Sequence, residues 1–353
     1  MQNGLLVGSR KGLLHFSQVG GAWALRGHHF KGVQVSATLA HGARWYVALR
    51  NGHFGPKLHA SDDGGASWQE LAVPALPSGD TDKPLDQIWT LALGGDGVLW
   101  AGCIPAGLFR SDDQGRSWQL VESLWRRPER SKWFGGGFDD AGIHSILIDP
   151  RDPSSLVLGI SCGGVWRSRD AGQSWDKYSR GMWAAYMPPE GREDPDIQDP
   201  HRLAQCQAAP GVFWCQHHNG EFRSDDDLAN WREIAPSTPL SSFGFAVAAH
   251  PHDPQTAWFV PAEVDQVRVP HEGDFYVLRT RDGGASFDKL QQGLPAAPAF
   301  HLIYRHALAV DDSGERLAMA STTGSLWVGE QQGEQWSRLS AELPPVYCLQ
   351  FIP

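Results

Sequence analysis

The sequence predicts an all-β fold, a seven-bladed β-propeller of four-stranded antiparallel blades, and two observations lead to this prediction. An eight-residue segment recurs in five copies, at residues 61–68, 111–118, 168–175, 224–231 and 280–287. Seven aromatic residues that close these copies, or two weaker echoes of them, are spaced 45 to 57 residues apart: Trp23, Trp68, Trp118, Trp175, Trp231, Phe287 and Trp336. A repeat of this period is typical of solenoids and propellers, and about fifty residues suit a four-stranded blade.

The recurring segment has the pattern S/T-x-D-x-G-x-S-W, and its positions predict a tight turn. We expect the Asp at the third place to accept backbone N–H bonds from two residues further on, as in Asx turns. The Gly at the fifth place can adopt positive φ without a Cβ clash. The closing Trp is expected to begin a strand and to pack into the blade. The fourth copy departs from the pattern, because Leu228 stands at the glycine place.

Short apolar segments before each turn are predicted to be strands. Examples are Ile143–Asp149 followed by 156–160, and Gly244–Ala249 followed by 256–260. These are runs of β-prone residues bounded by Gly and Pro, as strands usually are.

The two ends of the chain predict how the ring closes. Residues 346–352 look like an inner strand with no blade after it, and residues 4–8 look like a second strand with no inner strand before it. We therefore expect the C-terminal segment to join the N-terminal blade as its missing strand. This pairing would remove an open sheet edge.

Length and composition limit the functional classes. A chain of 353 residues ordinarily suggests two domains, but the uninterrupted repeat predicts a single propeller domain over residues 1–353. A net charge of −10 argues against nucleic acid as a partner, since phosphate contacts need a basic surface. No segment approaches eighteen apolar residues, so we expect no membrane association.

The N-terminus and the cysteines bear on location. The first residues show no secretion signal. Five cysteines without metal-binding spacing favour reduced, structural thiols. We therefore expect a cytoplasmic protein.

The repeated segment resembles the Asp-box, or BNR, repeat of sialidase-related propellers. Over nearly its whole length the chain resembles bacterial stand-alone BNR-repeat propellers, which are often labelled glycosyl hydrolase or sialidase-like. It is also similar to seven-bladed propellers of the photosystem II stability factor type, which bind partners without catalysing a reaction. In sialidase-like propellers the active site lies over the central channel, on the face opposite the Asp-box turns. The resemblance therefore implies a site made by loops between blades and by loops joining the second and third strands. It transfers no catalytic residue.

Polar and aromatic residues in or beside these loops are the candidates for ligand binding, because loops on a rigid scaffold commonly carry binding residues. The ligand-binding candidates are Arg10, Lys11, His29, His53, Trp89, His144, His217, His218, Arg305 and His306.

Glycoside hydrolysis commonly uses two carboxylates that face each other across a cleft. The candidate catalytic residues are Asp139, Asp140, Glu263 and Asp265. The first two end a glycine-rich segment, residues 133–140, which is flanked by aromatic residues and could cover a pocket. True sialidases have an Arg-Ile-Pro motif near the N-terminus and six blades, whereas this chain has no such motif and seven predicted blades.

Three functions therefore stay open. The favoured hypothesis is a propeller that binds a carbohydrate or another polar ligand at the mouth of the central channel, and the main alternative is a glycoside hydrolase. The third is a metal-dependent hydrolase. The pairs at residues 28–29 and 217–218 would project alternately from extended backbone, so one histidine of each pair could face the channel, where three imidazoles would suit zinc.

Linear spacing identifies no metal ligand, so none is assigned, and no cofactor is expected. The expected partner is a small molecule or a glycan. A protein partner is also compatible with the sequence.

Overall fold

The computed structural model describes residues 3–79, 83–234, 240 and 242–353. It contains seven four-stranded antiparallel sheets, each of which is one blade, so the predicted seven-bladed β-propeller is confirmed. No helix within the described residues is long and apolar enough to cross a membrane.

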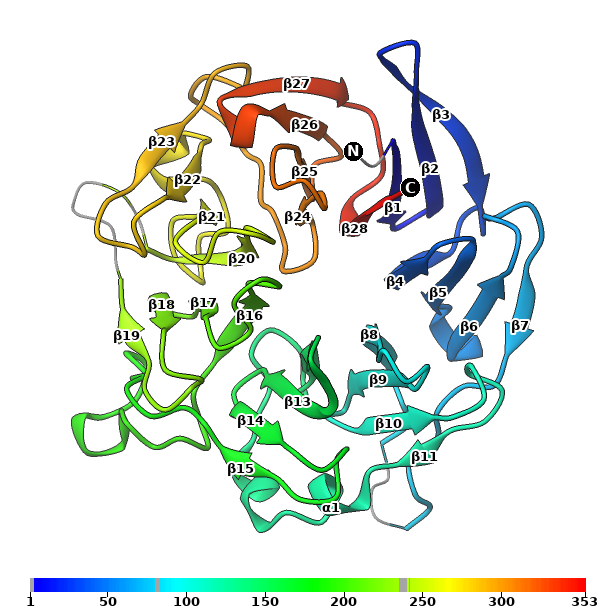
Figure 1. Cartoon of the computed structure of the whole chain (residues 1–353), viewed down its shortest axis with the longest axis vertical. Coiled ribbons are helices and arrows are strands. Elements are labelled where there is room, and N and C mark those ends of the chain that lie inside the picture. The colour runs from blue at the N-terminus through cyan, green and yellow to red at the C-terminus, as the bar shows by residue number, and fades with distance from the viewer. Residues whose placement is uncertain (1–2, 80–82, 235–239, 241) are drawn as a thin grey trace. The chain divides into compact units, whose positions relative to one another are not determined.

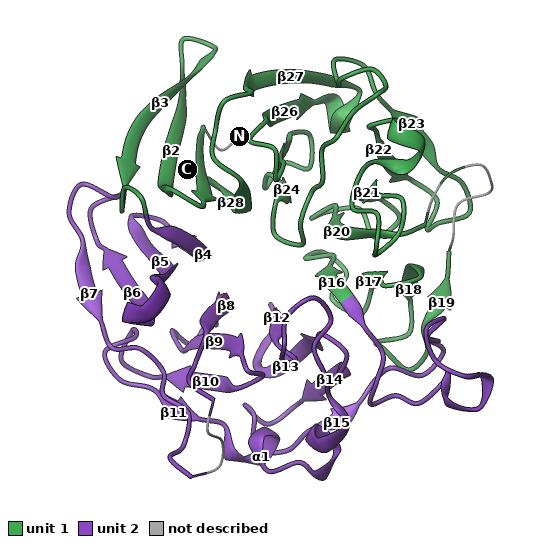
Figure 2. Ribbon diagram, turned by 180° about the vertical axis from the view of Figure 1, so that it is seen from behind, with its two compact units in different colours: residues 1–32, 201–353 green, residues 33–200 purple. Residues whose placement is uncertain are grey.

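The chain divides into two compact units, residues 1–32 with 201–353 (unit 1) and residues 33–200 (unit 2), shown in green and purple in Figure 2. The single domain expected from the repeat stays a prediction.

Unit 2 contains three of the sheets. Their strands are β4 (Gln34–His41), β5 (Arg44–Arg50), β6 (Pro56–Ser61) and β7 (Gln69–Leu71); β8 (Gln87–Leu93), β9 (Leu99–Ile104), β10 (Leu108–Ser111) and β11 (Gln119–Leu120); and β12 (Ile143–Asp149), β13 (Asp152–Ile160), β14 (Gly164–Ser168) and β15 (Asp176–Lys177). Its short helices are η1 (Gly52–Phe54), α1 (Glu122–Trp125), η2 (Pro128–Lys132) and η3 (Pro189–Gly191).

Unit 1 accounts for the other four sheets. Their strands are β1 (Gly4–Ser9), β2 (Gly12–Val19), β3 (Ala22–His29) and β28 (Val346–Ile352); β16 (Pro200–Gln205), β17 (Phe213–His217), β18 (Gly220–Ser224) and β19 (Arg232–Glu233); β20 (Gly244–Ala249), β21 (Ala257–Pro261), β22 (Val277–Thr280) and β23 (Asp288–Leu290); and β24 (Leu308–Val310), β25 (Leu317–Ala320), β26 (Leu326–Glu330) and β27 (Gln335–Ser340). The short helices η4 (His271–Gly273) and η5 (Gln331–Gly333) belong to the same unit.

The C-terminal strand joins the N-terminal sheet, as the sequence predicts. β28 pairs antiparallel with β1, with Gly4 opposite Ile352 and Val7 opposite Leu349, and the strand order is β28-β1-β2-β3. The two strands lie side by side at opposite ends of the colour range in Figure 1. β1 has a hydrogen-bonded neighbour on each side, β2 and β28, and it is buried along its whole length.

Tryptophan side chains fill the spaces between neighbouring sheets. Trp100 and Trp166 are buried in unit 2, and Trp214, Trp258 and Trp327 are buried in unit 1. Each lies on a strand and packs among Leu, Ile, Val and Ala side chains. A buried indole removes a large apolar area from water, so these residues contribute strongly to packing within each unit.

All five cysteines lie in the described part of the chain; they are buried and form no disulfide. Burial raises the pKa of the Cys103 thiol well above its usual value. These features agree with the structural role expected for the thiols.

Each of the five repeated segments forms the same type of hydrogen-bonded turn. In the first copy, Ser61 Oγ donates to Asp63 Oδ1 at 2.7 Å and accepts from the Gly65 N–H at 2.8 Å. Ser67 then donates its N–H and its hydroxyl to the two Asp63 carboxylate oxygens, at 2.8 and 2.6 Å. The prediction that the aspartate accepts an N–H bond from two residues further on is therefore wrong. The Ser67 N–H that binds Asp63 lies four residues further on, because the turn is longer than an Asx turn.

The fifth place of each turn has positive φ, as predicted. The angle is 89° at Gly65, 87° at Gly115, 86° at Gly172 and 89° at Gly284. Leu228 adopts the same left-handed conformation, with φ of 73°, although it is not a glycine. The strand after each turn begins one residue beyond the closing aromatic residue, which is a small correction to the expected start.

Candidate ligand-binding site

Unit 1 contains a cluster of aromatic, imidazole and guanidinium side chains, which we call the Phe245 cluster. Its members are His201, His218, Phe243, Phe245, Arg268, Tyr304, Arg305 and Tyr347. They come from β16, β20 and β28, from the residue before β20, and from the loops at residues 218–219, 262–276 and 291–307. The cluster therefore collects side chains from strands of three sheets of unit 1 and from loops beside them.

Phe245 and His201 form the base of the cluster. Their rings stack, with centroids 4.7 Å apart and planes 14° apart, and both residues are 2% exposed. Phe243 lies two residues before Phe245, and alternation along an extended chain places both rings on the same face. The Phe243 ring accordingly contacts the Phe245 ring at 5.3 Å and the His201 ring at 5.8 Å.

Two guanidinium groups lie over the Phe245 ring. The Cζ atoms of Arg305 and Arg268 are 5.3 and 5.5 Å from its centroid, within the range of a cation–π interaction. Arg305 is buried, whereas the Arg268 side chain is 38% exposed and pairs with Asp265 at 2.8 Å. The cluster thus carries positive charge on a chain whose net charge is negative.

The rim of the cluster is aromatic and accessible. Tyr304 contacts Phe245 edge-on at 5.6 Å and stacks on Tyr347 at 6.2 Å with a 16° interplanar angle. Both tyrosines are half-buried. A half-buried tyrosine offers an apolar ring face and a polar hydroxyl, a combination that suits binding surfaces.

Two imidazoles of the cluster have the placement of metal ligands. A ring nitrogen of His201 and one of His218 lie within 4.8 Å of each other. His201 Nδ1 donates to the Gly244 carbonyl at 2.6 Å, because a carbonyl oxygen can only accept.

A buried carboxyl group lies in the blade that carries these histidines. Glu221 on β18 is fully buried, and neither side-chain oxygen has a hydrogen-bond partner among the described residues. Burial, with the Glu233 charge adding to it, raises the pKa of Glu221 well above its usual value. The group is consequently held as the neutral acid, a protonation state that perturbed carboxyl groups at functional sites also show.

The predicted catalytic carboxylates each occupy a loop. Asp140 Oδ1 lies 2.5 Å from Lys83 Nζ, in unit 2. In unit 1, Glu263 Oε2 accepts from the Glu272 N–H at 2.8 Å and lies 3.1 Å from His271 Nδ1. Asp265 pairs with Arg268 and is thereby joined to the Phe245 cluster. The catalytic roles of these three residues and of Asp139 stay predictions.

Among the predicted ligand-binding residues of unit 2, Trp89 and His144 lie together. Their rings meet edge-on at 5.6 Å, and Phe138 from the glycine-rich segment packs edge-on against Trp89 at 5.1 Å. His144 is fully buried and Trp89 is 8% exposed, so this contact serves packing. His53 is exposed in η1, and its ring contacts the Phe54 ring with centroids 3.9 Å apart and planes tilted by 38°.

Among those of unit 1, the structure brings Arg305 and His218 into the Phe245 cluster. His217, the neighbour of His218, is instead buried beside Phe222 at 5.3 Å, so the two side chains project in different directions as expected. The remaining candidates lie on other parts of their sheets: Arg10 and Lys11 in the β1–β2 turn, His29 at the end of the outermost strand β3, and His306 before β24. The loop expected at His29 is therefore strand.

Phe245, Tyr347 and Glu221 are not among the site residues predicted from the sequence. Phe245 lies in a predicted inner strand, with Phe243 directly before that strand, and Tyr347 lies in another, so the faces of these side chains follow from the alternation along a strand. Glu221 offered a weaker signal, a lone acid between apolar residues in a short strand.

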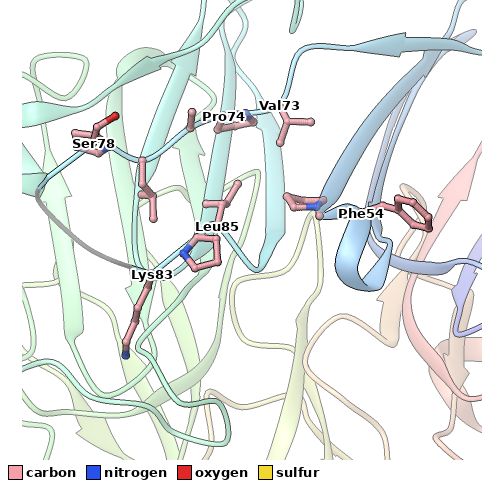
Figure 3. A pocket seen from close by; sticks show the side chains of 12 residues that line it. Phe54, Val73, Pro74, Ser78, Lys83 and Leu85 are labelled. Atoms are coloured by element: carbon pink, nitrogen blue, oxygen red, sulfur yellow. The ribbon is translucent and has the colours of Figure 1, made fainter.

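Unit 2 contains a hollow of about 490 Å³, which is lined by residues 54–56, 73–78 and 83–85. Figure 3 shows apolar side chains such as Val73 and Leu85 on its wall, with the Lys83 side chain extending away from them. Lys83 is the charged residue among its described lining residues, and its ammonium group binds Asp140. The hollow thus offers fewer polar groups for recognition than the Phe245 cluster does.

Comparison with known proteins places the chain among propellers. No family model matches the sequence. The chain is 21% identical over 328 residues to the probable oligoxyloglucan-reducing end-specific xyloglucanase of Neosartorya fischeri, covering 85% of this chain and 37% of that protein. It is 22% identical over 279 residues to the oligoxyloglucan-reducing end-specific xyloglucanase of Emericella nidulans, covering 70% and 31%. The chain therefore spans about a third of the length of these relatives.

Solved structures show the same fold at low identity. The GH74 xyloglucanase from Xanthomonas campestris superposes with a TM-score of 0.64 and 18% identity, over 98% of this chain and 52% of that one. YCF48 bound to a peptide gives a TM-score of 0.55 and 14% identity, over 100% and 90%. YCF48 from Cyanidioschyzon merolae gives 0.57 and 15%, over 100% and 96%. These similarities establish the propeller fold.

Proposed function

We propose that this propeller binds a carbohydrate at the Phe245 cluster. One observation carries the proposal: two guanidinium groups lie over the Phe245 ring, beside a stacked pair of half-buried tyrosines. Aromatic faces pack against the apolar faces of sugar rings, and guanidinium N–H groups donate in a fixed fork to ring hydroxyl or carboxylate oxygens. The xyloglucanases among the similar proteins support a carbohydrate as the ligand class.

Calorimetric titration with oligosaccharides tests this proposal. The panel should contain a xyloglucan oligosaccharide, a cello-oligosaccharide and an acidic, sialylated oligosaccharide. We expect saturable binding of at least one sugar. The affinity should be about tenfold lower, or lower still, in Tyr347→Ala and in Arg305→Lys, because Lys cannot reproduce the planar fork.

Phe54→Ala is the matched control for loss of an aromatic side chain. Phe54 is 67% exposed and belongs to unit 2, so its removal should leave sugar affinity unchanged. Absence of binding across the panel, or equal affinity in wild type and Tyr347→Ala, would reject the proposal.

Glycoside hydrolysis is the second candidate, because Asp265 is joined to the cluster through Arg268 and Glu263 lies in the same loop. A fluorogenic glycoside panel, including a sialoside, should then show turnover that falls by orders of magnitude in Glu263→Gln or Asp265→Asn. Turnover that falls instead in Asp139→Ala/Asp140→Ala would move catalysis to the glycine-rich segment. Sugar binding without turnover of any glycoside would support the binding function and reject glycoside hydrolysis.

A further inference from the structure

We propose that the sugar bound at the Phe245 cluster is an acidic one, whose carboxylate binds Arg268 and whose ring lies against Tyr304 and Tyr347. This inference rests on the proposed carbohydrate function and names the class of sugar. Two features of unit 1 carry it: positive charge gathered around one aromatic ring, and an accessible ion pair that a ligand carboxylate can replace.

Two positive charges are held beside the same ring. The Cζ atoms of Arg268 and Arg305 lie 5.5 and 5.3 Å from the Phe245 centroid, so their separation is less than the sum of these two distances. Like charges this close repel each other, and the repulsion is stronger away from water because the effective dielectric constant is lower there. A bound anion relieves this repulsion. The cluster therefore favours a negatively charged ligand over a neutral one.

Arg305 supplies the charge that salt screens least. It is 7% exposed, and interactions of buried charges are screened much less than those of exposed charges. Burial of a charged group is also costly unless opposite charge lies near it. A carboxylate bound at the rim of the cluster adds such charge. Arg305 therefore attracts the ligand through space and need not contact it.

Arg268 is the guanidinium group that a ligand can reach. Its side chain is 38% exposed, and its partner Asp265, at 2.8 Å, is 33% exposed. Ion pairs between such accessible side chains contribute little to stability. A ligand carboxylate can therefore replace the Asp265 carboxylate, and a guanidinium fork binds a carboxylate through two parallel N–H bonds.

Other carboxylates of the loop at residues 262–276 have partners of their own. Glu263 Oε2 accepts from the Glu272 N–H at 2.8 Å and lies 3.1 Å from His271 Nδ1. Asp274 binds Lys289 Nζ. Asp265 is consequently the carboxylate of this loop that competes directly with a ligand for Arg268.

The tyrosine pair provides a surface for the sugar ring. Tyr304 and Tyr347 are half-buried and stack at 6.2 Å with a 16° interplanar angle. Tyr304 also contacts Phe245 edge-on at 5.6 Å, so the pair begins next to the ring that carries the guanidinium groups. An aromatic face suits the apolar face of a pyranose, and a guanidinium group suits a carboxylate. A hexuronic acid combines both features in one sugar residue.

Calorimetric titration with trigalacturonate and with its methyl ester tests the inference, because esterification removes the charge and keeps the sugar rings. We expect the acid to bind about tenfold more tightly than the ester, as a hydrogen bond to a charged group should allow. This preference should decrease as NaCl is added, since salt screens the exposed Arg268.

The outcomes separate this inference from the carbohydrate function. Equal or tighter binding of the ester, or of the neutral cello-oligosaccharide, would overturn the acidic class while keeping a carbohydrate as the ligand. Absence of binding by every sugar would reject the carbohydrate function itself. Triglutamate carries three carboxylates without a sugar ring, so equal affinity for triglutamate would show that the site recognises charge alone and would also overturn the inference.

Three variants locate the carboxylate. Arg268→Gln should remove most of the preference for trigalacturonate over its ester. Asp265→Asn should act in the opposite direction and strengthen binding of the acid, because the competing carboxylate is gone. Arg305→Gln should weaken binding of the acid although Arg268 is intact. The thermal midpoint of each variant shows whether the chain still folds, and the first two changes are at accessible side chains.

Arg281→Gln is the matched control for loss of an exposed guanidinium group. The Arg281 side chain is 57% exposed and pairs with Asp288 at 3.2 Å in the same unit. Its preference for the acid should equal that of the wild type. Full preference in folded Arg268→Gln, or weaker binding of the acid in Asp265→Asn, would overturn the assignment of Arg268 as the carboxylate-binding residue.

Discussion

Ser117 donates both its backbone N–H and its hydroxyl to Asp113, at 2.9 and 2.7 Å, and so holds the two ends of a repeated turn together. The same pair of bonds occurs between Ser174 and Asp170 and between Ser286 and Asp282. In the fourth copy Asn230 replaces the serine, and its backbone N–H and its side-chain amide donate to the two Asp226 carboxylate oxygens, at 3.0 and 2.8 Å. The turn thus keeps its bonding pattern when the residue type changes.

Removing the carboxylate from one turn should destabilise the chain modestly. In Asp113→Ala, the bonds from Ser111 and Ser117 are lost, and we expect the thermal midpoint to fall by about 2–4 °C. Asp112→Ala is the adjacent control, since Asp112 makes a largely exposed ion pair with Arg110, and such pairs contribute little. Equal midpoints for the two variants would contradict a structural role for the third-place aspartate.

The turns should also make the chain sensitive to acid. Hydrogen bonds from the seventh-place serine hydroxyl, with further bonds from its N–H and from the first-place hydroxyl, lower the pKa of Asp63, Asp113, Asp170 and Asp282 to about 2. An unfolded aspartate has a pKa near 3.9. The stabilisation is therefore complete above about pH 4 and is lost as pH falls toward 2, because the unfolded chain then binds more protons.

Denaturant titrations between pH 5 and pH 2.5 measure this effect. We expect the free energy of unfolding to decline over that interval, and to decline less in a variant with Asn at two of these aspartates. An identical decline in the variant would attribute acid sensitivity to other groups.

Glu221 should produce the opposite pH dependence. Its pKa is raised in the folded chain, so above about pH 4.3 the unfolded chain is ionised at this residue while the folded chain stays protonated. Folding then binds a proton, and stability falls as pH rises. Glu221→Gln removes the titration, so its thermal midpoint relative to the wild type should increase from pH 5 to pH 8. Glu342→Gln, at an exposed position, should show no such trend; a constant difference for Glu221→Gln would mean that the acid ionises freely in the fold.

Leu228→Gly separates backbone strain from burial at the fifth place of the turn. Glycine would relieve a left-handed conformation that costs about 1–2 kcal/mol for other residues. Leu228 is fully buried, however, and removal of a buried leucine side chain typically costs about 2–5 kcal/mol. We therefore expect net destabilisation in urea unfolding, despite restoration of the consensus residue.

Gly115→Ala is the complementary variant. It introduces the strain and adds only one methyl group, whose Cβ would lie 3.1 Å from Leu71 Cδ1. It should destabilise by about 1–2 kcal/mol. If Leu228→Gly were more stable than the wild type, the strain energy of the left-handed conformation would exceed the free energy gained by burying the leucine side chain.

The blades were predictable because their signals are local. Each turn is defined within eight residues, and its closing aromatic residue marks the period directly. The pairing of β28 with β1 was also predictable, since each end of the chain lacked the strand that the other supplied.

The site was less predictable because its parts are distant in sequence. Arg305 and His218 were assigned for their loops, but Phe245 and Tyr347 lie on strands, where aromatic residues ordinarily belong to the core. His144 shows the converse, a polar residue predicted to bind ligand that is fully buried against Trp89. Linear spacing cannot distinguish these cases when each side chain comes from a different sheet.

The pairing of Gly4 with Ile352 has a consequence for synthesis on the ribosome. β1 is made before β28, with the other strands between them, so the apolar segment Leu5, Leu6 and Val7 stays without one neighbour until β28 has been synthesised. Pairings between residues so far apart in sequence also form slowly, because the intervening chain must first be ordered. The nascent protein therefore carries an unpaired apolar strand edge until β28 emerges from the ribosome, and chaperones that shield extended apolar segments would act at this strand.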